Sequence, residues 1–258
     1  MYDQIILFGD SITQYAWRSY GYGQSLADAY QRKLDVMGRG FSGYNSTQGL
    51  AVLPRVIPPP SADHTQPKVR LVTVFFGAND ACLPGTDQHV DLQTYTSNLE
   101  QIIRSPLAKQ HNPAIKFIII GPPPLDQHQQ APLDMQKKGH VRRTAEHTKL
   151  YADAAGELAA KLDVPYVNTW EEIQTLAGWK EKDEHVPGSL DAPKNETLAK
   201  MLYDGLHLSG DGYQVLFKAL LASIKQHYPE LDPDNLSAIA PFWDDAEFEA
   251  KTCKLVGN

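Results

Sequence analysis

The chain has 258 residues, of which 42% are hydrophobic and 21% charged, and it carries a formal net charge of −7. This composition is typical of a globular protein with a sizeable core. The acidic balance argues against binding to nucleic acid or to an anionic membrane, because such proteins present basic patches. No change in composition divides the chain, so we expect a single domain over residues 1–258, with residues 228–258 as a C-terminal extension.

The first residues and the cysteines indicate a cytoplasmic location. The first predicted strand leaves no room for a basic and then apolar signal peptide, and no apolar stretch reaches the length of a membrane span. We therefore expect neither secretion nor stable membrane insertion. Cys82 and Cys253 form no metal-ligand spacing and no disulfide framework, which favours a reducing compartment.

Short apolar runs alternate with apolar residues at helical spacing along most of the chain. In chain order, the predicted elements are a strand over 5–8, a helix from Leu26 to Met37, a strand over 69–76, a helix from Leu92 to Ile103, a strand over 115–120, a helix from Tyr151 to Leu162, a strand over 164–167 and a helix from Tyr213 to Ile224. This alternation predicts βα units and a mainly parallel sheet covered on both faces. Residues 177–203 mix charge, Pro and Gly, and we interpret them as a long loop with a short helix.

Three predicted strands end in glycine followed by turn or polar residues. These ends are Gly9-Asp10-Ser11, residues 77–80 (GAND) and Gly121-Pro122. Ligands of parallel α/β sheets bind beyond the carboxyl ends of the strands, and glycine lets backbone approach a ligand closely. The three strand ends therefore predict one rim of a site.

Ser11 is the candidate nucleophile of that site. A serine hydroxyl is a weak nucleophile and needs an adjacent base. His207 is the strongest candidate base, with Asp204 three residues before it, just ahead of a predicted helix. The carboxylate could fix the imidazole tautomer while the other ring nitrogen faces Ser11.

An acyl-transfer site also needs hydrogen-bond donors where the tetrahedral oxygen develops. The backbone N–H of Gly43, in GRGFSGYNS (38–46), is one candidate donor. The side-chain amide of Asn79, just past a strand end, is a second, and the backbone N–H of Ser11 is a third.

Four sequence blocks resemble those of the SGNH, or GDSL-type, hydrolases, in the same order. The blocks are GDSI (9–12), RGFSGY (39–44), GANDA (77–81) and DGLHLS (204–209). Together with IIIGPPP (118–124), they are similar to the isoamyl acetate-hydrolysing esterase branch. One departure is Gly38, where a common form of the second block has asparagine.

The resemblance implies a flavodoxin-like three-layer α/β/α sandwich with a mainly parallel five-stranded sheet. It implies that Ser11 is the nucleophile, His207 the general base oriented by Asp204, and Ser11, Gly43 and Asn79 the oxyanion donors.

The implied activity is hydrolysis of short-chain carboxylic esters, most of all acetate esters of small alcohols such as isoamyl acetate. The expected partner is a small ester, and no metal or organic cofactor is expected. An acyltransferase or deacetylase acting on a sugar or other hydroxyl compound is the alternative. A homodimer is a further expectation.

Taken singly, these residues have structural explanations. Ser11 could be a turn residue or helix N-cap, Asn79 a turn residue, and Asp204 and His207 a surface loop. We interpret Asp10 and Asp80 as residues that hold loops through backbone hydrogen bonds.

Other enzyme classes are disfavoured. GRGFSG (38–43) matches the dinucleotide fingerprint, but the strand before it is expected to be short and residues 42–49 open no clear helical period. The chain also has no GxSxG elbow and no HExxH motif.

Overall fold

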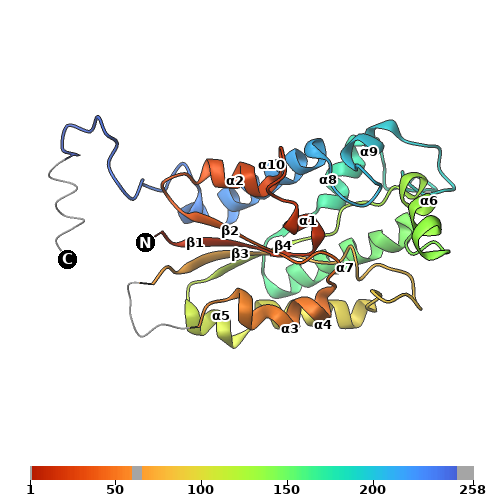
Figure 1. Cartoon of the computed structure of the whole chain (residues 1–258), viewed down its shortest axis with the longest axis horizontal. Helices are drawn as coiled ribbons and strands as arrows, with labels where there is room; N and C mark the ends of the chain where they lie inside the picture. The colour runs from red at the N-terminus through yellow and green to blue at the C-terminus, as the bar shows by residue number, and fades with distance from the viewer. Residues whose placement is uncertain (1, 60–65, 249–258) are drawn as a thin grey trace.

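Five parallel strands form the centre of the structure, a computed structural model that describes residues 2–59 and 66–248 (Figure 1). The strands are β1 (Gln4–Gly9), β2 (Asp35–Gly40), β3 (Val69–Phe75), β4 (Lys116–Ile120) and β5 (Tyr166–Val167). Their order across the sheet is β2-β1-β3-β4-β5, which is the flavodoxin-like order. The predicted fold class is therefore confirmed.

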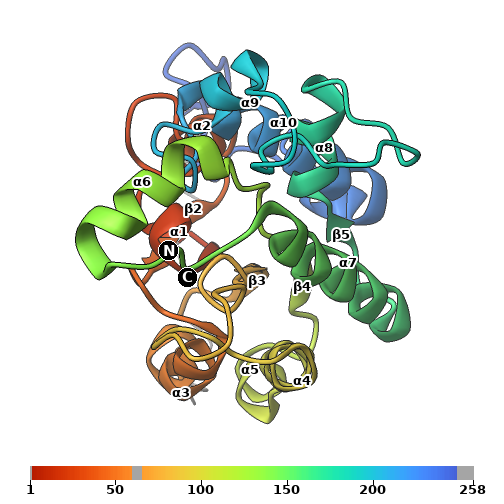
Figure 2. The same ribbon diagram turned by 90° about the vertical axis from the view of Figure 1, so that its right-hand side faces the viewer.

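Helices cover both faces of this sheet and make the three layers visible in Figures 1 and 2. They are α1 (Ser11–Gln14), α2 (Tyr22–Ala29), α3 (Ser46–Val56), α4 (Leu92–Ile103), α5 (Pro106–His111), α6 (Gln127–Lys138), α7 (Ala145–Leu162), α8 (Thr169–Leu176), α9 (Glu196–Met201) and α10 (Gly210–His227), followed by the 3-10 helix η1 (Pro229–Leu231). Helices α2, α8 and α10 cover one face, and α3, α4 and α7 cover the other.

Strand β1 divides its side chains between two hydrophobic cores. Ile5 and Leu7 pack in the core formed with α2, α8 and α10, whereas Ile6 and Phe8 pack in the core formed with α3, α4 and α7. Successive side chains of a strand point to opposite faces, so a strand buried on both faces reads as a continuous apolar run. This burial explains why the apolar run at residues 5–8 marked a strand correctly.

The sequence analysis expected a short strand before residue 38 but gave no bounds for β2 and overlapped it with a helix. We expected a helix from Leu26 to Met37, but α2 ends at Ala29 and Met37 lies in the strand. The strand lies at the edge of the sheet, contains two glycines and has no fully buried residue. An edge strand of this kind lacks a buried apolar run, and Met37 falls by coincidence at helical spacing from Leu34.

Residues 177–203 form a long loop that carries α9, as the sequence predicted. The predicted extension begins at residue 228, and its described part contacts the turn after α2. The Arg32 guanidinium donates hydrogen bonds to the carbonyl oxygens of Ala240 and Pro241, at 2.9 and 2.7 Å. The extension therefore lies near the amino ends of the strands, opposite α1 (Figure 1). Residues 249–258 of the predicted extension lie outside the described residues.

In the described ranges, none of the helices combines the length and the apolar character that crossing a membrane requires.

Gly40 at the end of β2 determines how closely α1 approaches the sheet. A Cβ atom at this position would lie 2.0 Å from the backbone nitrogen and 2.3 Å from the Cα of Gln14, the last residue of α1. Backbone at that distance has to move, so Gly40→Ala should destabilise the fold by about 1–3 kcal/mol. It should also displace the helix that begins at Ser11. Thermal unfolding measured by circular dichroism tests the first effect, and ester hydrolysis tests the second.

Gly38→Ala in the same strand is the matched control. Its Cβ would meet the indole ring of Trp17 at 2.6 Å, but this side chain is 42% exposed and can rotate away. Equal losses of stability in the two variants would contradict the role assigned to Gly40.

Candidate active site

A chain of two hydrogen bonds joins Ser11, His207 and Asp204. The Ser11 hydroxyl oxygen lies 2.9 Å from His207 Nε2, and His207 Nδ1 lies 2.7 Å from Asp204 Oδ2. Ser11 is buried and begins α1, directly after β1, while the other two residues lie in the loop between α9 and α10. The three side chains selected from the sequence are thus brought together from both ends of the chain.

The loop that carries His207 is held by Asp204. The Asp204 Oδ1 atom accepts hydrogen bonds from the backbone N–H groups of Leu206 and His207, at 3.0 and 2.8 Å, while Oδ2 faces the imidazole. Burial on its own raises the pKa of Asp204, but the hydrogen bonds from the His207 side chain and backbone and from the Leu206 backbone outweigh it. The net effect is a lowered pKa, so the carboxylate stays ionised and fixes the ring orientation.

Helix α10 is attached directly to the segment that carries the nucleophile. The buried Tyr213 hydroxyl donates a hydrogen bond of 2.7 Å to the carbonyl oxygen of Ile12, the residue after Ser11. This contact joins the helix that follows His207 to the helix that begins at Ser11.

Two aromatic rings contact the imidazole of His207. Tyr203 stacks on it with ring centroids 5.5 Å apart and an interplanar angle of 18°, and Tyr15 lies 5.6 Å away at 52°. The guanidinium of Arg18 covers the Tyr15 ring at 3.7 Å. Sequence reasoning missed Tyr203 as a neighbour of His207, because it lies in a segment with no strong periodicity.

The loops of Gly43 and Asn79 flank Ser11 on either side. They follow β2 and β3, the two neighbours of β1, and Gly9 lies opposite both Gly40 and Phe75 in the sheet. Gly43 has a φ of +82°, a conformation in which glycine carries no steric penalty.

The Asn79 side chain is buried, and its amide oxygen accepts two hydrogen bonds. Its amide nitrogen donates to the carbonyl oxygen of Tyr44 at 2.9 Å, and its oxygen accepts from Arg143 at 3.0 Å and Gln88 at 3.1 Å. Sequence reasoning missed Gln88 and Arg143. Neither lies in a block with a recognisable motif, so no local signal could have identified them.

The buried carboxylates Asp10 and Asp80 hold loops, as the sequence interpretation expected. Asp10 caps α1 by accepting a hydrogen bond from the Ile12 N–H at 2.9 Å, and Asp80 accepts from the Ser46 N–H with both oxygens, at 2.9 and 3.1 Å. Burial raises the pKa of Asp10 to about 7, although the Ile12 N–H and the nearby His207 act in the opposite direction.

One of the two premises used against a dinucleotide site was wrong, because α3 begins at Ser46, within residues 42–49. The strand before the motif is short, as expected, since β2 (Asp35–Gly40) includes the first three residues of GRGFSG. Nucleotide binding is disfavoured for a further reason. The first amides of α3 are occupied, because Asp80 accepts from Ser46 and the Asn45 side chain accepts from Gln48, and a carboxylate lies where a pyrophosphate would bind.

His, Cys, Asp and Glu side chains gather in no group of three or more that could hold a metal ion, over residues 2–59 and 66–248.

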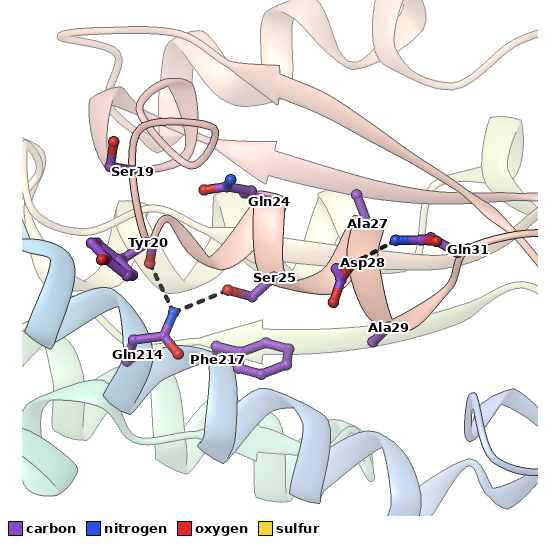
Figure 3. Close-up of a pocket in the computed structure, with 10 residues that line it drawn as sticks. All are labelled: Ser19, Tyr20, Gln24, Ser25, Ala27, Asp28, Ala29, Gln31, Gln214 and Phe217. Carbon is purple, nitrogen blue, oxygen red and sulfur yellow. Dashed lines mark hydrogen bonds between the residues drawn. The ribbon is translucent and has the colours of Figure 1, made fainter.

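A groove of about 880 Å³ lies between α2 and α10, and its lining residues do not include Ser11, His207 or Asp204 (Figure 3). The Gln214 amide contacts the backbone oxygen of Tyr20 and the hydroxyl of Ser25, both at 3.0 Å. A smaller cavity of about 670 Å³ is relevant to the candidate site, because Tyr15 and Tyr203, which contact His207, line it together with Trp17 and Arg18.

The raised pKa of Asp10 gives a prediction for stability. Between about pH 4 and pH 7, Asp10 keeps its proton in the folded protein but loses it in the unfolded chain. The free energy of unfolding therefore decreases as the pH rises through that range. Asp10→Asn cannot ionise and keeps an oxygen for the Ile12 N–H. Urea unfolding should therefore show the variant gaining stability relative to wild type between about pH 4 and about pH 8.

Asp91→Asn is the matched control, because Asp91 also caps a helix but is exposed and has a lowered pKa, caused mainly by hydrogen bonds from Thr94. Its contribution changes only below about pH 4, because Asp91 is ionised in both the folded and the unfolded chain above that pH. The stability difference between Asp91→Asn and wild type should therefore stay constant between about pH 4 and about pH 8. A pH-independent difference between Asp10→Asn and wild type would show that Asp10 does not titrate as described.

Comparison with known proteins adds to this geometry. The profile of the GDSL-like Lipase/Acylhydrolase family matches residues 7–215. A GDSL esterase/lipase of Arabidopsis thaliana is 34% identical, over 95% of this chain and 94% of its own length. The isoamyl acetate-hydrolyzing esterase of Saccharomyces cerevisiae is 32% identical, over 95% of both chains.

Solved structures show the same fold. A lipase/acylhydrolase from Enterococcus faecalis superposes with a TM-score of 0.59 at 22% sequence identity, covering 93% of this chain and 100% of its own.

Proposed function

The chain belongs to the GDSL-like lipase/acylhydrolase family and is a carboxylic ester hydrolase, and on this premise we propose that it hydrolyses short-chain esters through an acyl-enzyme on Ser11. The preferred substrates in this proposal are acetate esters of small alcohols, such as isoamyl acetate. The observation that carries the proposal is the pair of hydrogen bonds, 2.9 and 2.7 Å long, from Ser11 through His207 to Asp204.

In the first half of the proposed reaction, His207 accepts the Ser11 proton as the hydroxyl oxygen attacks the ester carbonyl. Asp204 holds the ring and stabilises the imidazolium that forms. The carbonyl oxygen becomes an oxyanion, and the N–H groups of Ser11 and Gly43 and the Asn79 amide donate hydrogen bonds to it. The tetrahedral intermediate then collapses as His207 passes its proton to the leaving alcohol, which leaves the acyl group on Ser11.

In the second half, water takes the place of the alcohol. His207 accepts a proton from the water molecule as its oxygen attacks the acyl carbonyl, and the same donors hold the second oxyanion. Collapse of this intermediate returns the proton from His207 to Ser11 and releases the carboxylic acid.

The cavity beside His207 supports a small alcohol as the leaving group. Since His207 protonates the alcohol, the alcohol departs on the imidazole side, where Tyr15, Trp17 and Tyr203 offer aromatic surface. Such surface suits a short branched alkyl group. The preference for acetate is supported by the isoamyl acetate-hydrolyzing relatives.

Replacing the nucleophile tests the proposal. Ser11→Ala should lower kcat by at least about 10³-fold, because the acyl-enzyme cannot form. Initial rates on p-nitrophenyl acetate, butyrate and octanoate measure this, and wild-type kcat/KM should be highest for acetate. Ser97→Ala, which removes an exposed serine of α4 outside the cavity beside His207, should keep full activity. Full activity in Ser11→Ala would exclude the acyl-enzyme, and a preference for octanoate would exclude the short-chain assignment.

The proposal also predicts how the rate depends on pH. A His207 that already carries a second proton cannot accept the proton of Ser11. The value of kcat/KM for isoamyl acetate, followed by acetate release, should therefore fall as the solution is acidified. A rate that stays constant well into the acid range would contradict the assignment of His207 as the base.

A further inference from the structure

Arg143 is a buried cation without a carboxylate partner. Its side chain is 3% exposed, and among residues 2–59 and 66–248 it forms no ion pair. Its guanidinium instead donates to three uncharged oxygens, the carbonyl of Ala78 at 2.9 Å, Asn79 Oδ1 at 3.0 Å and Gln88 Oε1 at 3.4 Å. All three oxygens belong to the loop that follows β3.

Burial of the Arg143 charge lowers the stability of the folded protein. Removing a charge from water costs several kcal/mol, and a paired counter-charge normally offsets part of that cost. Two carboxylates, Asp134 and Asp10, lie close enough to influence Arg143 without pairing with it. The Asp134 oxygens accept from the Gln130 side chain and the Arg142 N–H, and Asp10 Oδ1 accepts from the Ile12 N–H. The guanidinium of Arg143 therefore uses its hydrogen bonds on the loop that contains Asn79.

The contacts of Arg143 determine what the Asn79 amide can donate. With two donors on its oxygen, the amide cannot rotate by 180° without losing both hydrogen bonds and the one to Tyr44. One N–H of the amide is used by Tyr44, and the second remains for another acceptor. Donors on the amide oxygen withdraw electron density from its nitrogen, and so strengthen that second N–H as a donor.

Gln88 links the two loops that flank Ser11. Its Nε2 donates both to the carbonyl oxygen of Gly43, at 2.6 Å, and to Asn79 Oδ1, at 3.1 Å. Its own Oε1 accepts from Arg142 at 2.6 Å. One amide group thus fixes the backbone at Gly43 relative to the side chain of Asn79.

We propose that Arg143 and Gln88 are positioning residues for ester hydrolysis. Arg143 orients and polarises the Asn79 amide, and Gln88 holds the Gly43 and Asn79 donors in register for one developing oxyanion. The buried guanidinium meets its counter-charge when that oxyanion forms. This inference rests on the proposed function, since it assigns both residues to the oxyanion of the Ser11 acyl-transfer step.

Kinetics of Arg143→Met and Gln88→Ala test the inference. Each should lower kcat on p-nitrophenyl acetate by about 10–100-fold, a part of the 10²–10³ that loss of one oxyanion donor costs, while KM stays within about threefold. Arg143→Lys should recover part of the loss, because it restores the charge without the planar fork. Arg104→Met, which removes an exposed arginine paired with Glu100, should leave the kinetics unchanged.

A double-mutant cycle identifies the route of the effect. If Arg143 acts through Asn79, the double variant Asn79→Ala with Arg143→Met should be no slower than Asn79→Ala alone. Inhibition by a short alkylboronic acid, which forms a tetrahedral anion on a serine oxygen, should weaken in Arg143→Met in proportion to kcat/KM. Fully additive losses, or unchanged boronate inhibition, would overturn the inference.

Failure of this inference can be distinguished from failure of the proposed function. Full activity in Ser11→Ala would remove the proposed function, and the inference would fall with it. Full activity in Asn79→Ala would remove the oxyanion role of Asn79 and overturn the inference, but not the acyl-enzyme on Ser11. Impaired Asn79→Ala together with unimpaired Arg143→Met and Gln88→Ala would overturn only the inference. Circular dichroism and thermal unfolding check each variant. If Arg143→Met does not fold, Gln88→Ala and Arg143→Lys decide the outcome by the same split between kcat and KM.

Discussion

The pairing of β1 with β2 on one side and β3 on the other is the constraint on which the candidate site depends. Parallel strands send their following loops to the same edge of a sheet. Because Gly9 lies opposite both Gly40 and Phe75, the segments after all three strands begin at one level. Ser11, Gly43 and Asn79 follow within a few residues of these positions. The central β1 therefore brings the nucleophile between two loops that can carry donors.

Much of this arrangement was predictable from the sequence because its signals are local. The apolar runs of β1, β3 and β4 are buried on both faces, and helices such as α4 and α10 repeat apolar residues at helical spacing. The motif residues Ser11, Asn79 and His207 follow strands or precede helices that these patterns locate. The end of a strand or the start of a helix can be located to within a residue or two. This precision is enough to propose that the side chains at these positions lie close together.

What the sequence did not predict depends on non-local contacts. The edge strand β2 has no buried apolar run, and its place in the sheet is set by hydrogen bonds to β1. Gln88 and Arg143 are separated by more than fifty residues and lie in irregular segments, where polar residues are usually exposed. Their contacts depend on how the loop after β3 packs against the Gly43 loop and against the segment between α6 and α7. No spacing within the sequence predicts that packing.

The hydrogen bond from Tyr213 to Ile12 has a consequence for the order of events during synthesis. It joins two residues 201 positions apart, and the Ser11 and His207 side chains are separated by 196 positions. Contacts between such distant positions form late, because the long intervening chain must first be closed into a loop. Under the proposed mechanism, a chain that is still being synthesised contains the nucleophile Ser11 long before it contains the base His207. Hydrolytic competence then arises only when the final long helix docks, so unfinished chains cannot cleave esters.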